Sequence, residues 1–77
     1  MTRLEALKWM YENASSRDNA KHHTIVKLAI GEDFYRELDK MGFLASVYIV
    51  GDRYVWVSNL GNSYCKEIFK SWKKDIQ

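Results

Sequence analysis

The fold of this chain is decided by one continuous stretch, HTIVKLAIGEDFYRELDKMGFLASVYIVGDRYVWVS, which runs from residue 23 to residue 58. It opens with an apolar segment that we expect to be a helix over residues 22–30. Periodicity alone also leaves a strand open there, since Ile25 and Val26 are β-branched. Gly31 ends this segment and separates it from the next.

Residues 32–41 carry the clearest helix pattern in the chain. Two acidic residues, Glu32 and Asp33, stand where they favour the first turn of a helix. Gly42 stands where a left-handed C-cap belongs. The expected apolar face is formed by Phe34, Leu38 and Met41.

A β-hairpin is predicted next, with strands at residues 43–50 and 53–58. Both runs alternate with a period of two, and Gly51-Asp52 between them is a tight-turn signature. We expect one face to carry Ala45, Val47, Ile49, Val55 and Val57. The opposite face would then carry Tyr48, Val50, Tyr54 and Trp56.

Helices are predicted on both sides of this stretch, at residues 2–13 and 62–75. The first has Leu4, Leu7 and Tyr11 on one face, which Met10 extends, and a capping box from Thr2 to Glu5. The last opens at residues 61–63 and has a broad apolar stripe made of Tyr64, Cys65, Ile68, Phe69, Trp72 and Ile76. We therefore expect one α+β domain over residues 1–77, mostly helical.

Composition limits the class of protein. The chain has 77 residues, of which 47% are hydrophobic and 29% charged, and this is typical of one small globular domain. A single cysteine, Cys65, excludes an internal disulfide and a multi-thiolate zinc site. We find neither a signal peptide nor an apolar run of the ~18 residues that a membrane span needs. We expect a cytoplasmic protein with no membrane partner.

The residues that could do chemistry do not form a catalytic or metal-binding pattern. Neighbouring side chains on a helix, such as those of His22 and His23, point about 100° apart and rarely chelate one ion. Cys65 has no identifiable activating partner. Ser15, Ser16 and Asp18 fit turn chemistry better than a catalytic triad. We expect no enzyme, no metal and no cofactor, and therefore a binding module.

The order of these elements resembles a winged helix-turn-helix domain of small prokaryotic and phage regulators. Residues 24–31 occupy the place of its supporting helix and turn, and residues 34–44 match a recognition helix that ends in a glycine and two apolar residues. Residues 57–64 are similar to the exit from the wing into the last helix. The resemblance implies three helices, a two-stranded wing and a C-terminal helix.

The resemblance also implies a regulator of transcription that binds double-stranded DNA. By position, the third helix would turn Asp33, Tyr35, Arg36 and Lys40 toward base edges. Phosphates would be contacted from the helix before it by Lys21, His22, Thr24 and Lys27, with the lysines at the C-terminal end adding affinity. Arg53 and Tyr54, at the tip of the wing, would contact the adjacent groove.

The charge pattern leaves a second function open. The whole chain has a formal net charge of +2, but residues 31–42 hold four acidic residues against two basic ones, a net charge of −2. A negative recognition helix works against phosphate neutralisation. The alternative is a protein–protein interaction module, such as a small phage or accessory factor, on the same scaffold.

The aromatic residues predict an interface. Three tryptophans, five tyrosines and three phenylalanines exceed what one small core is expected to hide. We expect a homodimer in which the first and last helices pair across a two-fold axis, with an interface drawn from Trp9, Tyr48, Trp56, Phe69, Trp72 and Ile76. In the other interpretation, the last helix folds back and buries these residues within one chain.

Overall fold

The computed structural model describes the backbone of residues 1–76 and the side chains of residues 1–69. This part of the chain forms four α-helices and a three-stranded antiparallel sheet, so the expected α+β class is confirmed. In chain order the elements are α1 (Arg3–Asn13), a 3₁₀ turn η1 (Arg17–Asn19), β1 (Lys21–His22), α2 (His23–Ile30), α3 (Glu32–Lys40), β2 (Leu44–Ile49), β3 (Asp52–Val57) and α4 (Asn59–Ile76).

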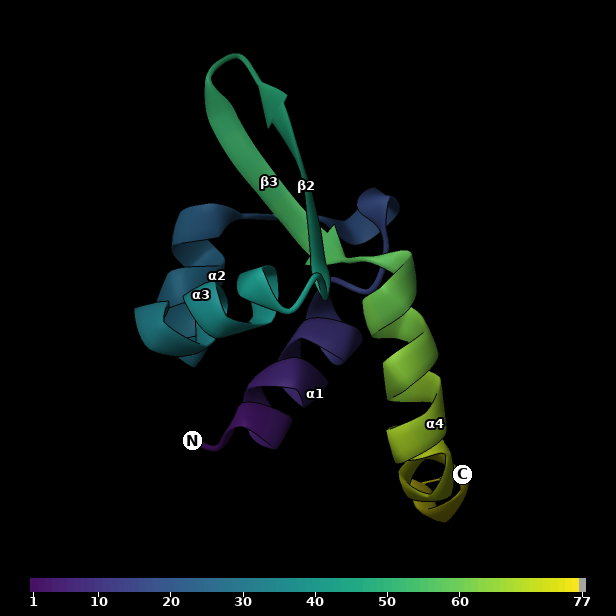
Figure 1. Cartoon of the computed structure of the whole chain (residues 1–77). Helices are drawn as coiled ribbons and strands as arrows, with labels where there is room; N and C mark the ends of the chain where they lie inside the picture. The colour runs from purple at the N-terminus through teal and green to yellow at the C-terminus, as the bar shows by residue number, and fades with distance from the viewer. Residues whose placement is uncertain (77) are drawn as a thin grey trace.

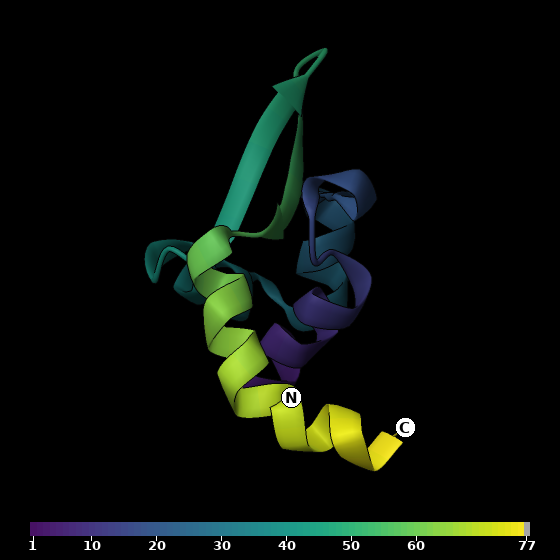
Figure 2. The ribbon, with the colours of Figure 1, turned by 90° about the vertical axis from the view of Figure 1, so that its right-hand side faces the viewer.

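The hairpin of β2 and β3 projects from a helical base. Figure 1 shows α2 and α3 on one side of this base, α4 on the other and α1 between them, and Figure 2 shows the hairpin leaving the helices in the second view as well. All four helices and the lower part of the hairpin contribute to one core. Its most deeply buried side chains are Met10, Leu38, Val26, Val55, Val57 and Cys65.

The sheet has a third strand that the sequence did not predict. β1 pairs with β3, with Lys21 opposite Val55 and His22 opposite Tyr54, and gives the strand order β1-β3-β2. Two residues are too few to show an alternating pattern, so periodicity cannot detect such a strand. This short strand fixes the start of α2 against the hairpin.

The predicted division of the hairpin into two faces is partly wrong. Residues directly opposite each other in an antiparallel pair share a face, and the register pairs Tyr48 with Arg53 and Ser46 with Val55. Tyr48 therefore lies on the same face as the buried strand residues Val55 and Val57. The other face carries Ala45, Val47, Ile49, Asp52, Tyr54 and Trp56.

The turn of the hairpin lies one residue earlier than predicted. Its two central residues are Val50 and Gly51, with φ of 52° and 83°, and Asp52 is the first residue of β3. Two positive φ values define a type I′ turn, which matches the twist of the strands. Valine is a poor residue for this conformation because its β-branch crowds the left-handed backbone.

The last helix also begins earlier than predicted, at Asn59 rather than at residue 62. The Ser58 hydroxyl accepts the Gly61 N–H at 3.1 Å and caps the first turn. Gly61 is needed in this turn because a larger residue would collide with its neighbours. A Cβ there would lie 2.6 Å from the Phe43 carbonyl oxygen and 2.7 Å from Val57 Cγ1.

The buried face of α1 agrees only partly with the prediction. The capping box of Thr2 and Glu5 is present in α1. However, α1 buries Ala6, Leu7 and Met10, while Leu4 is 52% exposed and outside the core, contrary to prediction. Leu7 and Met10 of the predicted stripe are buried and Tyr11 is packed against the core, so Leu4 is misplaced and Ala6 was missed. Small residues such as Ala6 carry little weight in a pattern of large apolar residues, which explains the error.

Candidate nucleic-acid interface

Tyr35 lies at the centre of a polar cluster between α2, α3 and the hairpin. It is only 4% exposed, so the prediction that it faces solvent from α3 is wrong. The helix buries Tyr35 and Leu38, whereas Phe34 is partly buried and Met41 is 39% exposed. Burial raises the pKa of the Tyr35 phenol, against the opposing effect of the Arg53 charge, so the hydroxyl stays protonated at neutral pH.

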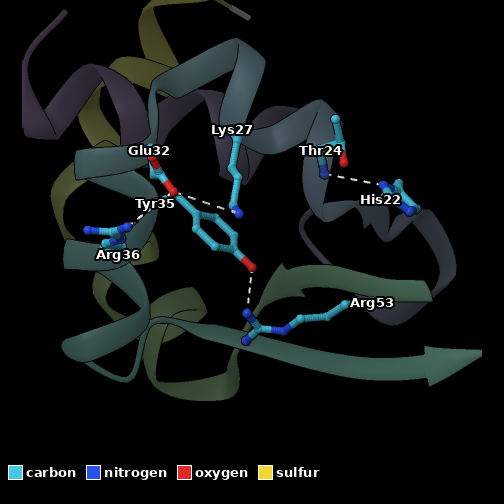
Figure 3. A network of polar contacts seen from close by, with 7 residues as sticks. All are labelled: His22, Thr24, Lys27, Glu32, Tyr35, Arg36 and Arg53. Carbon is cyan, nitrogen blue, oxygen red and sulfur yellow. Dashed lines mark hydrogen bonds and ion pairs between the residues drawn. The ribbon is translucent and has the colours of Figure 1, made fainter. Parts of the chain in front are cut away.

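Arg53 joins the hairpin to α3. Its Nη1 donates to the Tyr35 hydroxyl at 2.6 Å, and its Nη2 donates to Asp39 Oδ1 at 3.4 Å. Figure 3 shows the guanidinium group turned from the strand back toward Tyr35. The side chain is 23% exposed, so Arg53 is not the freely projecting group at the wing tip that the sequence predicted. Its geometry is that of a positioning residue.

Lys27 and Arg36 share one carboxylate on the outer side of this cluster. Lys27 Nζ lies 4.0 Å from Glu32 Oε1 and 5.4 Å from the centre of the Tyr35 ring. The Arg36 Nη2 atom lies 3.2 Å from the same Glu32 oxygen, and its side chain is 72% exposed. Exposed ion pairs of this kind contribute little to stability.

The start of α2 is held by His22. Its Nδ1 accepts the Thr24 N–H at 3.2 Å and caps the helix. The other ring nitrogen must then carry the proton, and Nε2 donates to Asp52 Oδ1 at 3.1 Å. The ring also meets the Tyr54 ring edge-on at 5.5 Å, and Thr24 itself is exposed. His22 therefore connects the beginning of α2 to the far end of the hairpin.

The other predicted contact residues lie around this cluster. The Lys21 amine donates to the Asn19 carbonyl oxygen at 3.1 Å. Asp33 and Lys40 are exposed on α3, and Tyr54 is half-buried on the hairpin face that carries Trp56. The structure connects Lys27, Arg36 and Arg53 through Glu32 and Tyr35, whereas His22 and Thr24 form a separate contact at the start of α2 (Figure 3). Arg53 is engaged within the fold.

The formal charges of the segment that builds this cluster cancel. Residues 21–57 contain five basic and five acidic side chains. Three of the basic ones, Lys27, Arg36 and Arg53, have a carboxylate within 4.0 Å. Thus the cluster is a set of internal ion pairs rather than a band of unpaired cations.

The four predicted dimer residues whose side chains the structure describes do not form one surface. Phe69 is 5% exposed and belongs to the core, so its assignment to an interface is wrong, and Trp9 is partly buried against the same core. Trp56 is half-buried and Tyr48 is 70% exposed, both on the hairpin. The side chains of Trp72 and Ile76 lie outside the described residues. Sequence reasoning missed the exposed apolar residues Leu4, Leu60 and Tyr64 on α1 and α4.

Other kinds of site are not built in the described part of the chain. It holds no group of three or more histidine, cysteine or acidic residues placed to bind a metal ion. Cys65 is fully buried, as its place in the apolar stripe predicts, and burial raises the pKa of its thiol to about 11. A thiol with that pKa is protonated at pH 7 and is a poor nucleophile.

Among the described helices, none has the length and apolar character to cross a membrane.

Comparison of this chain with protein-family models, with curated proteins and with solved structures finds no match. The case for a function therefore rests on the geometry and charges described above.

Proposed function

We propose that this chain is a winged helix-turn-helix protein that binds double-stranded DNA and regulates transcription. In this proposal α2 and α3 are the helix-turn-helix pair, with Gly31 as the turn, and β2 and β3 are the wing. The strand order β1-β3-β2 supports it, because β1 anchors the start of α2 to the same sheet that carries the wing. A fold alone does not assign a function, so the proposal also needs a site.

The observation that carries the proposal is the gathering of cationic and hydrogen-bonding groups from three elements around Tyr35 (Figure 3). Lys27 comes from α2, Arg36 from α3 and Arg53 from β3. In a helix-turn-helix complex, the second helix enters the major groove while the first crosses the backbone. Arg36, exposed on α3, is then the residue placed for base edges, and Lys27 is placed for a phosphate.

Arg53 has a different part in this proposal. Because its guanidinium group is tied to Tyr35 and Asp39, it holds the wing at a fixed angle to α3. A fixed angle reduces the conformational entropy lost when both elements meet one duplex. We assign the base-reading role to Arg36 and the positioning role to Arg53.

A salt series tests this function. We expect the fluorescence anisotropy of a labelled duplex to rise with protein concentration, with an affinity that falls as salt is increased. Lys27→Ala should weaken binding to all duplexes and lower the slope of log K against log salt by about 1. Arg36→Ala should instead reduce the preference among duplexes of different sequence. Lys66→Ala is the matched control, since it removes the same charge from an exposed position on α4. The affinity predicted from the sequence for the C-terminal lysines is not part of this proposal.

The proposal fails if the unmodified protein gives no salt-dependent binding to any duplex at low ionic strength. It also fails if Lys66→Ala and Lys27→Ala weaken binding equally, because the cluster would then have no special part in it.

A protein–protein interaction module is the second candidate, and the charge balance favours it. Residues 31–42 have a net charge of −2, and the ion pairs of the cluster leave few free cations. The double variant Glu32→Gln with Asp33→Asn separates the two functions. It should strengthen duplex binding if α3 faces DNA, because it removes two negative charges that repel the phosphates. If this variant leaves duplex binding absent, and pull-down of a partner depends on these carboxylates, the protein-binding function is preferred.

A further inference from the structure

The strand β2 forms an edge of the sheet. In the order β1-β3-β2 it pairs with β3 on one side and with no other described strand on its second side. In both overall views the upper part of the hairpin stands clear of the helices (Figures 1 and 2). Tyr48 is 70% exposed and Ile49 is 53% exposed there.

The turn shows which backbone groups of β2 face outward. In a type I′ turn the residue before the two central ones bonds to the residue after them, so the backbone of Ile49 faces Asp52 on β3. Backbone direction alternates along a strand, so Val47 also faces β3, and Ser46 and Tyr48 face away from it. By this alternation, the outward N–H and C=O groups of Ser46 and Tyr48 have no strand to pair with among the described residues, and no turn, loop or cap bond reaches them.

This edge lacks the features that usually protect one. Natural edge strands carry charged residues, proline or bulges that prevent pairing with another chain. β2 reads Leu-Ala-Ser-Val-Tyr-Ile, with no charge and no proline, and its register with β3 is unbroken from Leu44 to Ile49. The strand is therefore able to accept a further strand along its outer side.

We infer that two copies of this chain pair through β2, antiparallel and about a two-fold axis at Val47, to form one continuous six-stranded sheet. In this register Ser46 of each copy lies opposite Tyr48 of the other. The outward N–H and C=O groups of both residues are then satisfied in two hydrogen-bonded pairs. Val47 meets its own copy in the closer, non-hydrogen-bonded position.

Charge favours a second copy as the occupant. A strand that pairs with itself about a two-fold axis brings identical positions together, so charges near the axis would repel. β2 has none, and the charged residues of the hairpin, Asp52 and Arg53, are both on β3. The pairing also places Ile49 opposite Ala45 of the other copy, so that apolar side chains on the face of Val47 meet across the axis.

This inference replaces the pairing of first and last helices expected from the sequence, and it does not depend on DNA binding. Sedimentation equilibrium over a range of protein concentrations measures it directly. We expect a dimer for the unmodified chain and a monomer for Val47→Lys and for Val47→Glu, each of which brings two like charges together at the axis. An equimolar mixture of these two variants should recover the dimer.

Ser63→Lys is the matched control, because it adds the same charge at an exposed position on α4 and should leave the dimer intact. Amide hydrogen exchange gives a second readout. Protection of the Ser46 and Tyr48 N–H groups should rise with protein concentration, while that of Val47, bonded within the hairpin, should change less. The inference is overturned if the chain stays monomeric, if Val47→Lys leaves the dimer unchanged, or if the mixture of charge variants does not associate.

Discussion

Two parts of the hairpin differ in how far their polar groups are satisfied within one chain. The inner side is the face of Arg53 and Val55 that is turned toward α3, and the outer side is the free edge of β2. On the inner side, Arg53 bonds to Tyr35 and Asp39, and Val55 is fully buried beneath them. On the outer side, Ser46 and Tyr48 present backbone groups that no described residue meets. The inner side therefore contributes to the stability of the monomer, whereas the outer side has bonding capacity left for another molecule.

The largest effect should come from the core beneath the inner side. Val55→Ala should lower the free energy of unfolding by about 2–3 kcal/mol, because it removes two buried methyl groups and leaves a cavity. Val47→Ala, on the half-buried outer strand, should cost less than about 1 kcal/mol in the monomer. Urea denaturation at low protein concentration measures both. Equal costs would mean that the two sides are packed alike.

The next effect concerns the connection between the hairpin and α3. Arg53→Met should cost about 1–2 kcal/mol, since it leaves the buried Tyr35 hydroxyl without its donor. In a double-mutant cycle with Tyr35→Phe, the two changes should be coupled by about 1 kcal/mol. Additive losses would show that the hydrogen bond between these residues does not hold the hairpin.

The turn should show an effect of the opposite sign. Val50 is 97% exposed and has a left-handed backbone with φ of 52°, which asparagine adopts far more readily. Val50→Asn should therefore raise the free energy of unfolding by about 1 kcal/mol, part of the left-handed cost of a non-glycine residue. Thermal unfolding measures the change, and a lower melting temperature would show that the Val50 side chain has contacts that stabilise the tip.

The smallest effect should appear at alkaline pH. Burial raises the pKa of Tyr35 in the folded state, so the unfolded chain loses this proton first. The stability that Tyr35 contributes is complete below its unfolded pKa of about 10 and falls as the pH rises through the interval up to the folded pKa. Denaturant titrations between pH 9 and pH 11 should show a smaller loss for Tyr35→Phe. An identical loss in both proteins would assign the effect to other groups.

Much of the fold could be predicted because it depends on strong periodic patterns. The helices at residues 22–30 and 32–41 and the two strands of the hairpin agree with the structure to within about two residues, a normal uncertainty at element ends. Gly42 has the expected left-handed backbone, with φ of 80°. β1 and the start of α4 were missed, since a two-residue strand and a serine cap have no periodicity to detect.

The candidate site was less predictable because it depends on which carboxylate each cation meets. The positions of Lys27 and Arg36 could be inferred from helix spacing, but the burial of Tyr35 and the return of Arg53 toward α3 depend on tertiary packing. The error at Phe69 has a similar cause, because an apolar helix stripe looks the same whether its own domain or a partner covers it.

An NMR titration of the ¹⁵N-labelled protein with a short duplex tests the central claim most directly, since it reports where DNA is bound. We predict chemical-shift changes concentrated at the start of α2, at Lys27 and along the first turns of α3, with smaller changes at the inner side of the hairpin. Shifts confined to α1 and α4, or no shifts at low salt, would contradict the assignment of this face to nucleic acid.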